Sequence, residues 1–320
     1  MKPLILPLLG LLMLAGCNRP GNQTEKPSTL PEARKGFVTK LPAQTGIRHP
    51  VDTPPAGVFQ VVKYASPAGN MSAYLSPDPK DGKKRPAIIW ITGGDCNSIG
   101  EGCWEEGPAD GDESACQYRK AGIMMMFPAL RGGNTNPGFK EGYYGEVEDV
   151  LAAADFLAKQ EYVDPARIYL GGHSTGGTLA LLVAECSDRF RAVFSFGPVD
   201  DVSGYPAEFL PFNHSNRKEV ELRSPGYWLS GIKSPVFVLE GGRKGNIECL
   251  QNMSRATSNP NVHFLPVNWG DHFSILAPMN RLLAEKILQD DGPESNLTLT
   301  EEDVKKPQAA NKKQKPKAKE

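Results

Sequence analysis

The chain has 320 residues, of which 39% are hydrophobic and 23% are charged, and its formal net charge is -1. This composition provides enough apolar side chains for a large core, and it excludes a wholly disordered chain and a small disulfide-stapled protein. A chain so close to neutrality has no overall positive field, so no nucleic-acid partner is expected.

The first seventeen residues are expected to be an export signal. Lys2 precedes the apolar run 3–15, which suits a signal-peptide core and is too short to span a membrane as a helix. Residues 14–17 (LAGC) resemble the lipobox of bacterial lipoproteins. That resemblance implies lipidation of Cys17 and a membrane anchor in the bacterial cell envelope. Because Asn18 rather than aspartate follows the cysteine, the outer membrane is favoured if the cell is Gram-negative.

Polar segments flank the body of the chain on both sides. Residues 18–35 are predicted to be a flexible tether, because they contain almost no large apolar residues. Residues 291–320 are predicted to be a disordered tail, whose last part, 304–320, holds seven lysines and one glutamate. One folded domain is expected between them, over 36–290.

Short apolar runs alternate with amphipathic stretches through this domain. Helices are expected over 146–159, 176–185 and 281–289, and strands over 58–64, 71–75, 87–92, 123–127, 167–170, 192–196 and 236–239. Several of these runs, such as AIIWIT at 87–92, are apolar throughout, as in strands that are buried on both faces. The alternation predicts an α/β fold in which helices cover both faces of a mostly parallel sheet.

A candidate nucleophile lies between one of these strands and the helix that follows it. Residues 172–176 (GHSTG) form a G-x-S-x-G motif directly after the strand that ends at Leu170. Glycines allow the tight turn that this motif requires, and the start of a helix favours negative charge. We therefore predict that Ser174 is a nucleophile.

A serine hydroxyl also needs a base that takes its proton. Of the five histidines, His272 in GDHF at 270–273 fits best, because it lies just before the last helix. His173 is the variable residue of the motif and is expected to point elsewhere. We therefore predict His272 as the general base.

The order of these motifs resembles the α/β-hydrolase fold. More narrowly, it is similar to the catalytic domain of prolyl oligopeptidase-family serine peptidases and to dienelactone-hydrolase-like esterases. The resemblance rests on FPALRGG at 127–133, on GEVEDV at 145–150 and on DPARIYLGGHS at 164–174, and it extends over 36–290. It implies a serine hydrolase that cleaves a small peptide or ester through an acyl-enzyme on Ser174.

An oxyanion hole needs two N–H donors directed at the developing charge. One is expected to be the amide of Thr175, which follows the nucleophile. The other is expected from Gly94 or Asp95, because TGGD at 92–95 resembles the His-Gly-Gly loop of esterases.

The third catalytic residue is where the chain departs from the family pattern. The family places aspartate in a Gly-x-x-Asp turn after the strand that here begins at Val236, but this chain has Lys244 at that position. A cation cannot stabilise an imidazolium, so another carboxylate must replace it. Glu240 is the first choice, and the alternatives are Glu248, Asp200 and Asp201.

The remaining cysteines give no reason to expect a metal or any other cofactor. Cys96 and Cys103 have no zinc-site spacing and no accompanying histidine. Outside the cytoplasm disulfides are permitted, so Cys96–Cys103 is a candidate bridge and Cys103–Cys116 a competing one, and the pairing stays open. Because five is an odd number, at least one of these thiols is free or pairs outside the chain.

A second class of function stays open at this stage, as does the oligomeric state. The chain would be a binding or scaffold lipoprotein that retains the hydrolase fold without activity. Lys244 in place of the acid is the main argument for it, and Ser174 and His272 argue against it.

Overall fold

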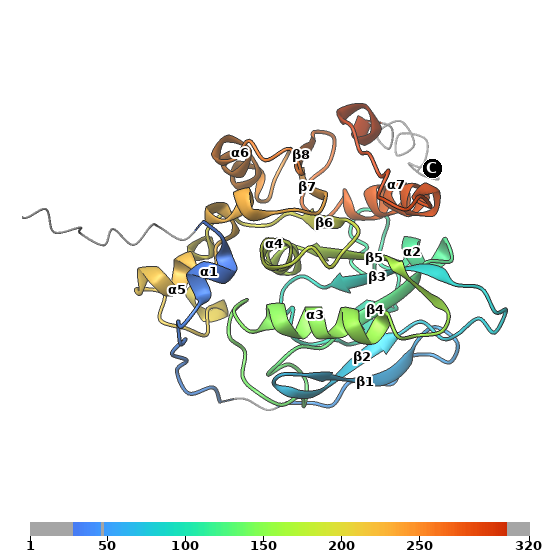
Figure 1. The fold of residues 1–320 in the computed structure, drawn as a ribbon, viewed down its shortest axis with the longest axis horizontal. Coiled ribbons are helices and arrows are strands. Elements are labelled where there is room, and N and C mark those ends of the chain that lie inside the picture. The colour runs from blue at the N-terminus through green and yellow to red at the C-terminus, as the bar shows by residue number, and fades with distance from the viewer. Residues whose placement is uncertain (1–27, 46–47, 306–320) are drawn as a thin grey trace, which may run out of the picture.

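A single mixed sheet organises the protein (Figure 1). The computed structural model describes residues 28–45 and 48–305. Within them the strand order is β1-β2-β4-β3-β5-β6-β7-β8, in which β2 runs antiparallel to β1 and β4 and all other pairs are parallel. The strands are β1 Gln60–Ser66, β2 Gly69–Leu75, β3 Arg85–Ile91, β4 Met124–Pro128, β5 Val163–His173, β6 Val193–Phe196, β7 Val236–Gly241 and β8 Val262–Val267. The predicted mostly parallel sheet is confirmed.

Both faces of the sheet are buried, which explains the apolar runs in the sequence. Successive side chains of a strand point to opposite faces. In β3, Ala87, Ile89 and Ile91 therefore pack into one hydrophobic core, and Ile88 and Trp90 pack into a second core on the other face.

Helices cover the two cores, as the alternation of elements predicts (Figure 1). The first core receives side chains from α1 Leu30–Arg34, α3 Glu146–Leu157, α4 Thr175–Cys186, α5 Arg217–Glu221 and α6 Ile247–Ala256. The second core receives them from α2 Cys116–Lys120 and α7 Leu276–Gln289. The carboxyl ends of the central parallel strands thus meet at one edge, where ligands bind in open α/β sheets.

The prediction of a flexible tether over 18–35 is wrong for its last part. Thr29 and Glu32 form a capping box at the start of α1, and Leu30 is completely buried. The Arg34 guanidinium donates hydrogen bonds to the carbonyls of Tyr143, Tyr144 and Leu222 at 2.8–3.1 Å. The polar composition of the segment gave no indication of this packing, because Leu30 and Arg34 alone make most of the contacts.

The prediction of a disordered tail over 291–320 is also wrong for the residues that the structure describes, which end at 305. Leu297, Leu299 and Val304 are buried in the second core, and the Trp269 indole N–H donates to the Val304 carbonyl at 2.9 Å. These apolar residues are spaced along a polar segment and show no clear periodicity. The lysine-rich residues 306–320 lie outside the described residues.

A buried carboxylate fixes the start of that segment. Asp290 is fully buried and accepts hydrogen bonds from the Arg191 guanidinium, from the Tyr169 hydroxyl and from the Ser295 hydroxyl. Burial opposes ionisation of Asp290, but the hydrogen bonds outweigh it, Arg191 first, and they lower the pKa to about 2. Arg191 also donates to the carbonyls of Gly292 and Glu294, so this ion pair holds the chain after α7 against the body.

The candidate disulfides are absent from the described part of the chain, where all five cysteines are free. Cys96 packs into the first core and Cys103 into the second, on the opposite face of the sheet. The Cys116 thiol donates to Asp112 instead, at 3.4 Å. Burial raises the pKa of Cys103 to about 12, so this thiol stays protonated at neutral pH.

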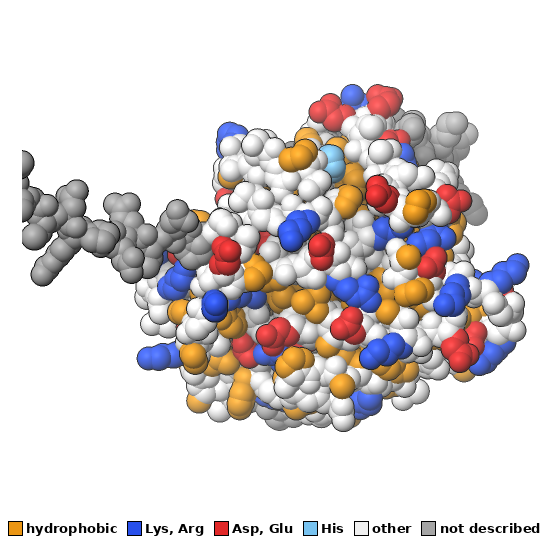
Figure 2. Space-filling view, viewed as in Figure 1, with side chains coloured by type: hydrophobic (Ala, Val, Ile, Leu, Met, Phe, Trp, Pro, Cys, Tyr) orange, Lys and Arg blue, Asp and Glu red, His pale blue; other side chains and the backbone are white. Residues whose placement is uncertain are grey.

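The surface shows charges of both signs among apolar side chains. On the face drawn in Figure 2, the basic and acidic side chains of the described residues are interspersed and do not gather by sign. Among the helices of the described residues, none is long and apolar enough to cross a membrane.

Candidate active site

The candidate nucleophile occupies a strained turn between β5 and α4. Ser174 has φ 55° and ψ -115°, a backbone conformation that residues with a side chain rarely adopt. Its amide donates to the Phe196 carbonyl at 2.7 Å, and its carbonyl accepts from the Thr178 amide at 2.9 Å. Such strain persists only where the surroundings enforce it, and it is concentrated at functional sites.

The glycines of the motif are required by close backbone packing. A Cβ at Gly172 would lie 2.3 Å from the Gly176 carbonyl oxygen, and one at Gly176 would lie 2.3 Å from the Ile91 carbonyl oxygen. A Cβ at Gly177 would lie 2.5 Å from the Phe196 carbonyl oxygen. Only glycine therefore fits at these three positions, beside the backbone of β3, of β6 and of the turn itself, as the sequence motif predicts.

A carboxylate–imidazole pair lies beside this turn. His272 Nδ1 is 2.8 Å from Glu240 Oε2, and the Glu240 side chain at the end of β7 is completely buried. Glu240 also accepts hydrogen bonds from the amides of Gly241 and Asn246, at 2.6 and 3.2 Å. Because an ionised carboxylate only accepts, His272 carries a proton on Nδ1, and Nε2 is left with a free lone pair.

The pair and the nucleophile meet at the end of β6. The Ser174 amide donates a hydrogen bond to the carbonyl of Phe196, the last residue of β6. A Cβ at Gly197, which follows Phe196, would lie 2.4 Å from His272 Cε1 and 2.6 Å from Glu240 Oε2. Within the residues that the structure describes, no hydrogen bond joins the Ser174 hydroxyl to His272. Catalytic hydrogen bonds of this kind are often long in the free enzyme and shorten when substrate binds.

The other candidate acids have different partners. Asp200 accepts a hydrogen bond from Asn252 at 2.9 Å, and Asp201 caps a short 3-10 helix by accepting from the Ser203 amide. Glu248 and Lys244 are both exposed. The structure therefore brings Glu240, and not the alternatives, against His272.

His173 was expected to point elsewhere, but it contacts the candidate base. Its Nε2 is 3.1 Å from the His272 carbonyl oxygen, and the two ring centroids are 4.5 Å apart. Burial, and then the neighbouring His272, lower the pKa of His173 to about 3, so this imidazole is neutral at physiological pH. A motif that specifies only glycine and serine carries no signal for this contact.

The candidate oxyanion donors lie on the loop after β3 and at the start of α4. The Thr175 hydroxyl donates to the Gly94 carbonyl at 2.9 Å, which ties this loop to the turn at Ser174. Gly94 has φ 66°, a conformation that favours glycine. Among the described residues, no hydrogen bond is found from the amides of Asp95 or Thr175, so these donors remain available for a ligand.

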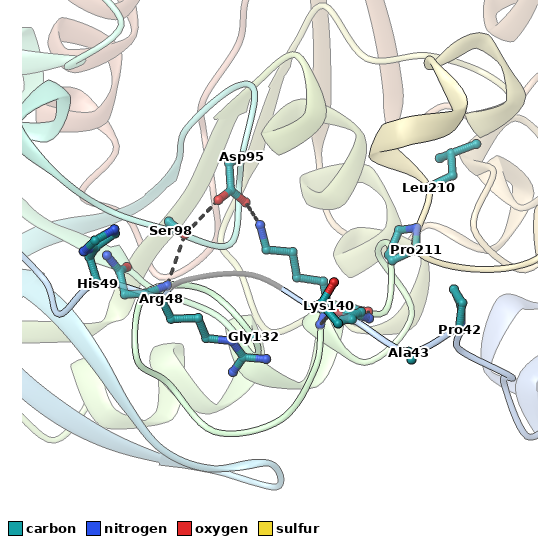
Figure 3. Close-up of a pocket in the computed structure, with 13 residues that line it drawn as sticks. Pro42, Ala43, Arg48, His49, Asp95, Ser98, Gly132, Lys140, Leu210 and Pro211 are labelled. Carbon is teal, nitrogen blue, oxygen red and sulfur yellow. Dashed lines mark hydrogen bonds and ion pairs between the residues drawn. The ribbon is translucent and has the colours of Figure 1, made fainter.

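An ion pair fixes the position of the same loop. Asp95 accepts from Lys140 Nζ at 2.7 Å and from the Ser98 hydroxyl at 2.8 Å (Figure 3). These residues lie on the wall of a pocket of about 700 Å³, which also contains Arg48 and His49.

Known sequences are similar to part of the chain, and that part contains Ser174. Residues 115–231 match the prolyl oligopeptidase family. The match contains Ser174 but ends before Glu240 and His272. A probable dipeptidyl-aminopeptidase B of Colletotrichum graminicola is 31% identical over 123 residues, which are 38% of this chain and 12% of that protein. Prolyl oligopeptidase A of Amanita bisporigera is 33% identical over 79 residues, 23% of this chain and 10% of that protein.

The chain thus spans about a tenth of the length of these curated relatives. Solved structures extend the likeness to most of the fold. A puromycin-hydrolysing peptidase of Mycobacterium tuberculosis has a TM-score of 0.56 at 21% identity, over 72% of this chain and 39% of that chain. A hyperthermophilic esterase of Pyrobaculum calidifontis also has a TM-score of 0.56, at 17% identity, over 73% of this chain and 86% of that chain. The fold is that of the α/β-hydrolases.

Proposed function

We propose that the chain is a serine hydrolase that cleaves a peptide or ester bond through an acyl-enzyme on Ser174. The observation that carries the proposal is the strained Ser174 turn beside the His272–Glu240 pair. The match of residues 115–231 to the prolyl oligopeptidase family supports it, because peptidases of that family act on acyl bonds.

The geometry assigns each residue a step. Glu240 holds His272 with its proton on Nδ1, so Nε2 accepts the proton of the Ser174 hydroxyl as its oxygen attacks the acyl carbonyl. The amides of Thr175 and of Gly94 or Asp95 stabilise the developing negative oxygen. His272 then gives the proton to the leaving group, and the acyl-enzyme forms. Water, activated by His272, cleaves the acyl-enzyme and frees Ser174.

A fluorophosphonate probe tests this proposal, because it phosphonylates only an activated serine. The wild-type protein should be labelled, Ser174→Ala should not be, and Ser203→Ala, which changes an exposed serine, should be labelled like the wild type. In-gel fluorescence measures the labelling. An unlabelled wild type would instead support the non-catalytic scaffold.

The proposed activity includes two substrate classes, peptides and esters, which one assay can compare. The sequence relatives are named as peptidases, whereas one of the structural neighbours is an esterase. Two sets of chromogenic substrates compare the classes. Esters are represented by a panel of p-nitrophenyl esters, and peptides by aminoacyl and prolyl anilides. We expect hydrolysis in at least one of them that disappears in Ser174→Ala.

We further propose that Cys17 is lipidated and that the protein is anchored in the bacterial cell envelope. Cys17 and the rest of residues 1–27 lie outside the described residues, so the proposal rests on the LAGC sequence at 14–17. Cells grown with an alkyne fatty acid should incorporate it into the wild-type protein and not into Cys17→Ser. Equal incorporation into both proteins would exclude Cys17 as the attachment site.

A further inference from the structure

The pocket drawn in Figure 3 begins at the candidate oxyanion loop. Asp95 lines its wall and directly follows Gly94, whose carbonyl accepts the 2.9 Å hydrogen bond from the Thr175 hydroxyl. Thr175 in turn follows Ser174. With a volume of about 700 Å³ the pocket is in the range of small-molecule sites, so a substrate whose scissile carbonyl lies at Ser174 can extend into it.

Positive charge exceeds negative charge on the wall of this pocket. Arg48 and Lys140 line it, and Asp95 is the one acid among the described residues that do so. Lys140 Nζ lies 2.7 Å from the Asp95 carboxylate, so these two charges largely offset each other. No carboxylate of the described residues forms an ion pair with Arg48, and a guanidinium stays charged in proteins. The pocket therefore keeps the charge of Arg48 for a ligand.

Two amide side chains of the wall are already used by the protein backbone. Gln44 accepts from the Lys140 amide at 3.0 Å and donates to the Lys140 carbonyl at 2.6 Å. Asn134 is bonded in the same way to Ile99, at 2.9 Å and 3.1 Å. These neutral side chains fix the shape of the pocket, and their donors and acceptors are not free to select a ligand.

The Arg48 guanidinium is held in a way that leaves one of its edges free. Its Nη1 donates to the carbonyls of Asn136 and Gly138 at 3.0 Å and 3.1 Å, and its central carbon lies 5.7 Å from the centre of the Phe139 ring. Nε and Nη2 have no acceptor among the residues that the structure describes. The N–H groups of Nε and Nη2 lie side by side and match the two oxygens of a carboxylate.

We propose that the substrate carries a carboxylate and that Arg48 binds it through Nε and Nη2. The inference rests on the proposed serine hydrolase function and names the class of substrate for that site. Arg48 acts as a specificity residue. Because Gly94 and Asp95 separate the pocket from the turn at Ser174, this carboxylate lies several bonds away from the scissile carbonyl.

The experiment compares esters that differ in charge at one end. On the acyl side, the p-nitrophenyl hemi-esters of adipic, suberic and sebacic acid are compared with the esters in which a carboxamide replaces the free carboxylate. On the leaving-group side, the 3-carboxy-4-nitrophenyl and 3-carbamoyl-4-nitrophenyl esters of butanoate are compared after division by their spontaneous hydrolysis rates. For the wild type we expect kcat/KM to be about 10-fold or more higher for at least one carboxylate ester than for its carboxamide partner.

Variants of Arg48 test whether this residue causes the preference. Arg48→Gln should reduce the ratio of the two kcat/KM values to about one, and Arg48→Glu should make the carboxamide ester the better substrate. Lys40→Gln is the matched control, since Lys40 is exposed in the same segment but does not line the pocket. It should keep the wild-type ratio. Because both esters are measured on the same protein, a partly unfolded variant does not change the ratio.

The outcomes separate this inference from the proposed function. A wild type that is labelled by the uncharged fluorophosphonate but cleaves carboxylate and carboxamide esters equally would overturn the inference alone. A preference that persists in Arg48→Gln, or that falls equally in Lys40→Gln, would also overturn it, because another group or general electrostatic attraction would then explain the preference. An unlabelled wild type would overturn the proposed function and this inference with it.

Discussion

Replacing Glu240 by glutamine is expected to lower kcat by about 10⁴ while the protein stays folded. The Glu240 carboxylate accepts three hydrogen bonds, from the Gly241 amide, the Asn246 amide and His272 Nδ1. Glutamine has one acceptor oxygen and one NH₂ group. If the oxygen serves the backbone amides, the NH₂ faces His272 Nδ1 and forces the imidazole proton onto Nε2. His272 then has no lone pair for the Ser174 proton.

The kinetics of the best ester or anilide measure this effect, and a thermal unfolding curve confirms the fold. Glu248→Gln is the control, because it removes the same charge from an exposed position on α6. A loss in Glu248→Gln that equals the loss in Glu240→Gln would contradict the assignment of Glu240 as the acid.

Gly197→Ala is expected to lower kcat by about 10², because a displacement of about 1 Å in a catalytic group costs that much. Gly197 has φ 58°, and its added methyl group would lie 2.4 Å from His272 Cε1 and 2.6 Å from Glu240 Oε2. The His272 ring must therefore move away from the end of β6. The positive φ adds about 1–2 kcal/mol of strain for alanine.

The rate of fluorophosphonate labelling and kcat should fall together in this variant. Gly204→Ala is the control, since a Cβ there would meet Val199 Cγ1 at an ordinary 3.7 Å. Full activity in Gly197→Ala would show that His272 has another working position, and it would contradict the geometry on which the mechanism depends.

The sequence predicts the turn at Ser174 well, because the physical requirements of that turn are local. A buried strand, glycines at 172 and 176 and a helix of small residues are all visible in one short segment. The central strands are equally visible, since a strand buried on both faces must be apolar throughout. Edge strand β8 mixes buried, half-buried and exposed residues and is correspondingly weaker as a pattern.

The carboxylate that pairs with His272 and the structure of the two terminal segments could not be predicted from such local patterns. The choice among Glu240, Glu248 and Asp200 depends on which carboxylate the fold brings to His272, and those residues are far apart in the chain. The disulfide pairing was open as well, because proximity in sequence does not reveal that Cys96 and Cys103 pack on opposite faces of the sheet. Short segments such as α1 are fixed by a few long-range contacts that composition does not record.

The docking of α1 sets a limit on how far from its proposed anchor the proposed hydrolase can act. Arg34 and Leu30 fasten this helix to the body, so at most about eleven residues, 18–28, separate the body from Cys17. Even fully stretched, this stretch reaches only about 40 Å. With Cys17 lipidated as proposed, the start of α1 would stay within about 40 Å of the lipid anchor, so the proposed hydrolase would act on substrates that come near the lipid surface.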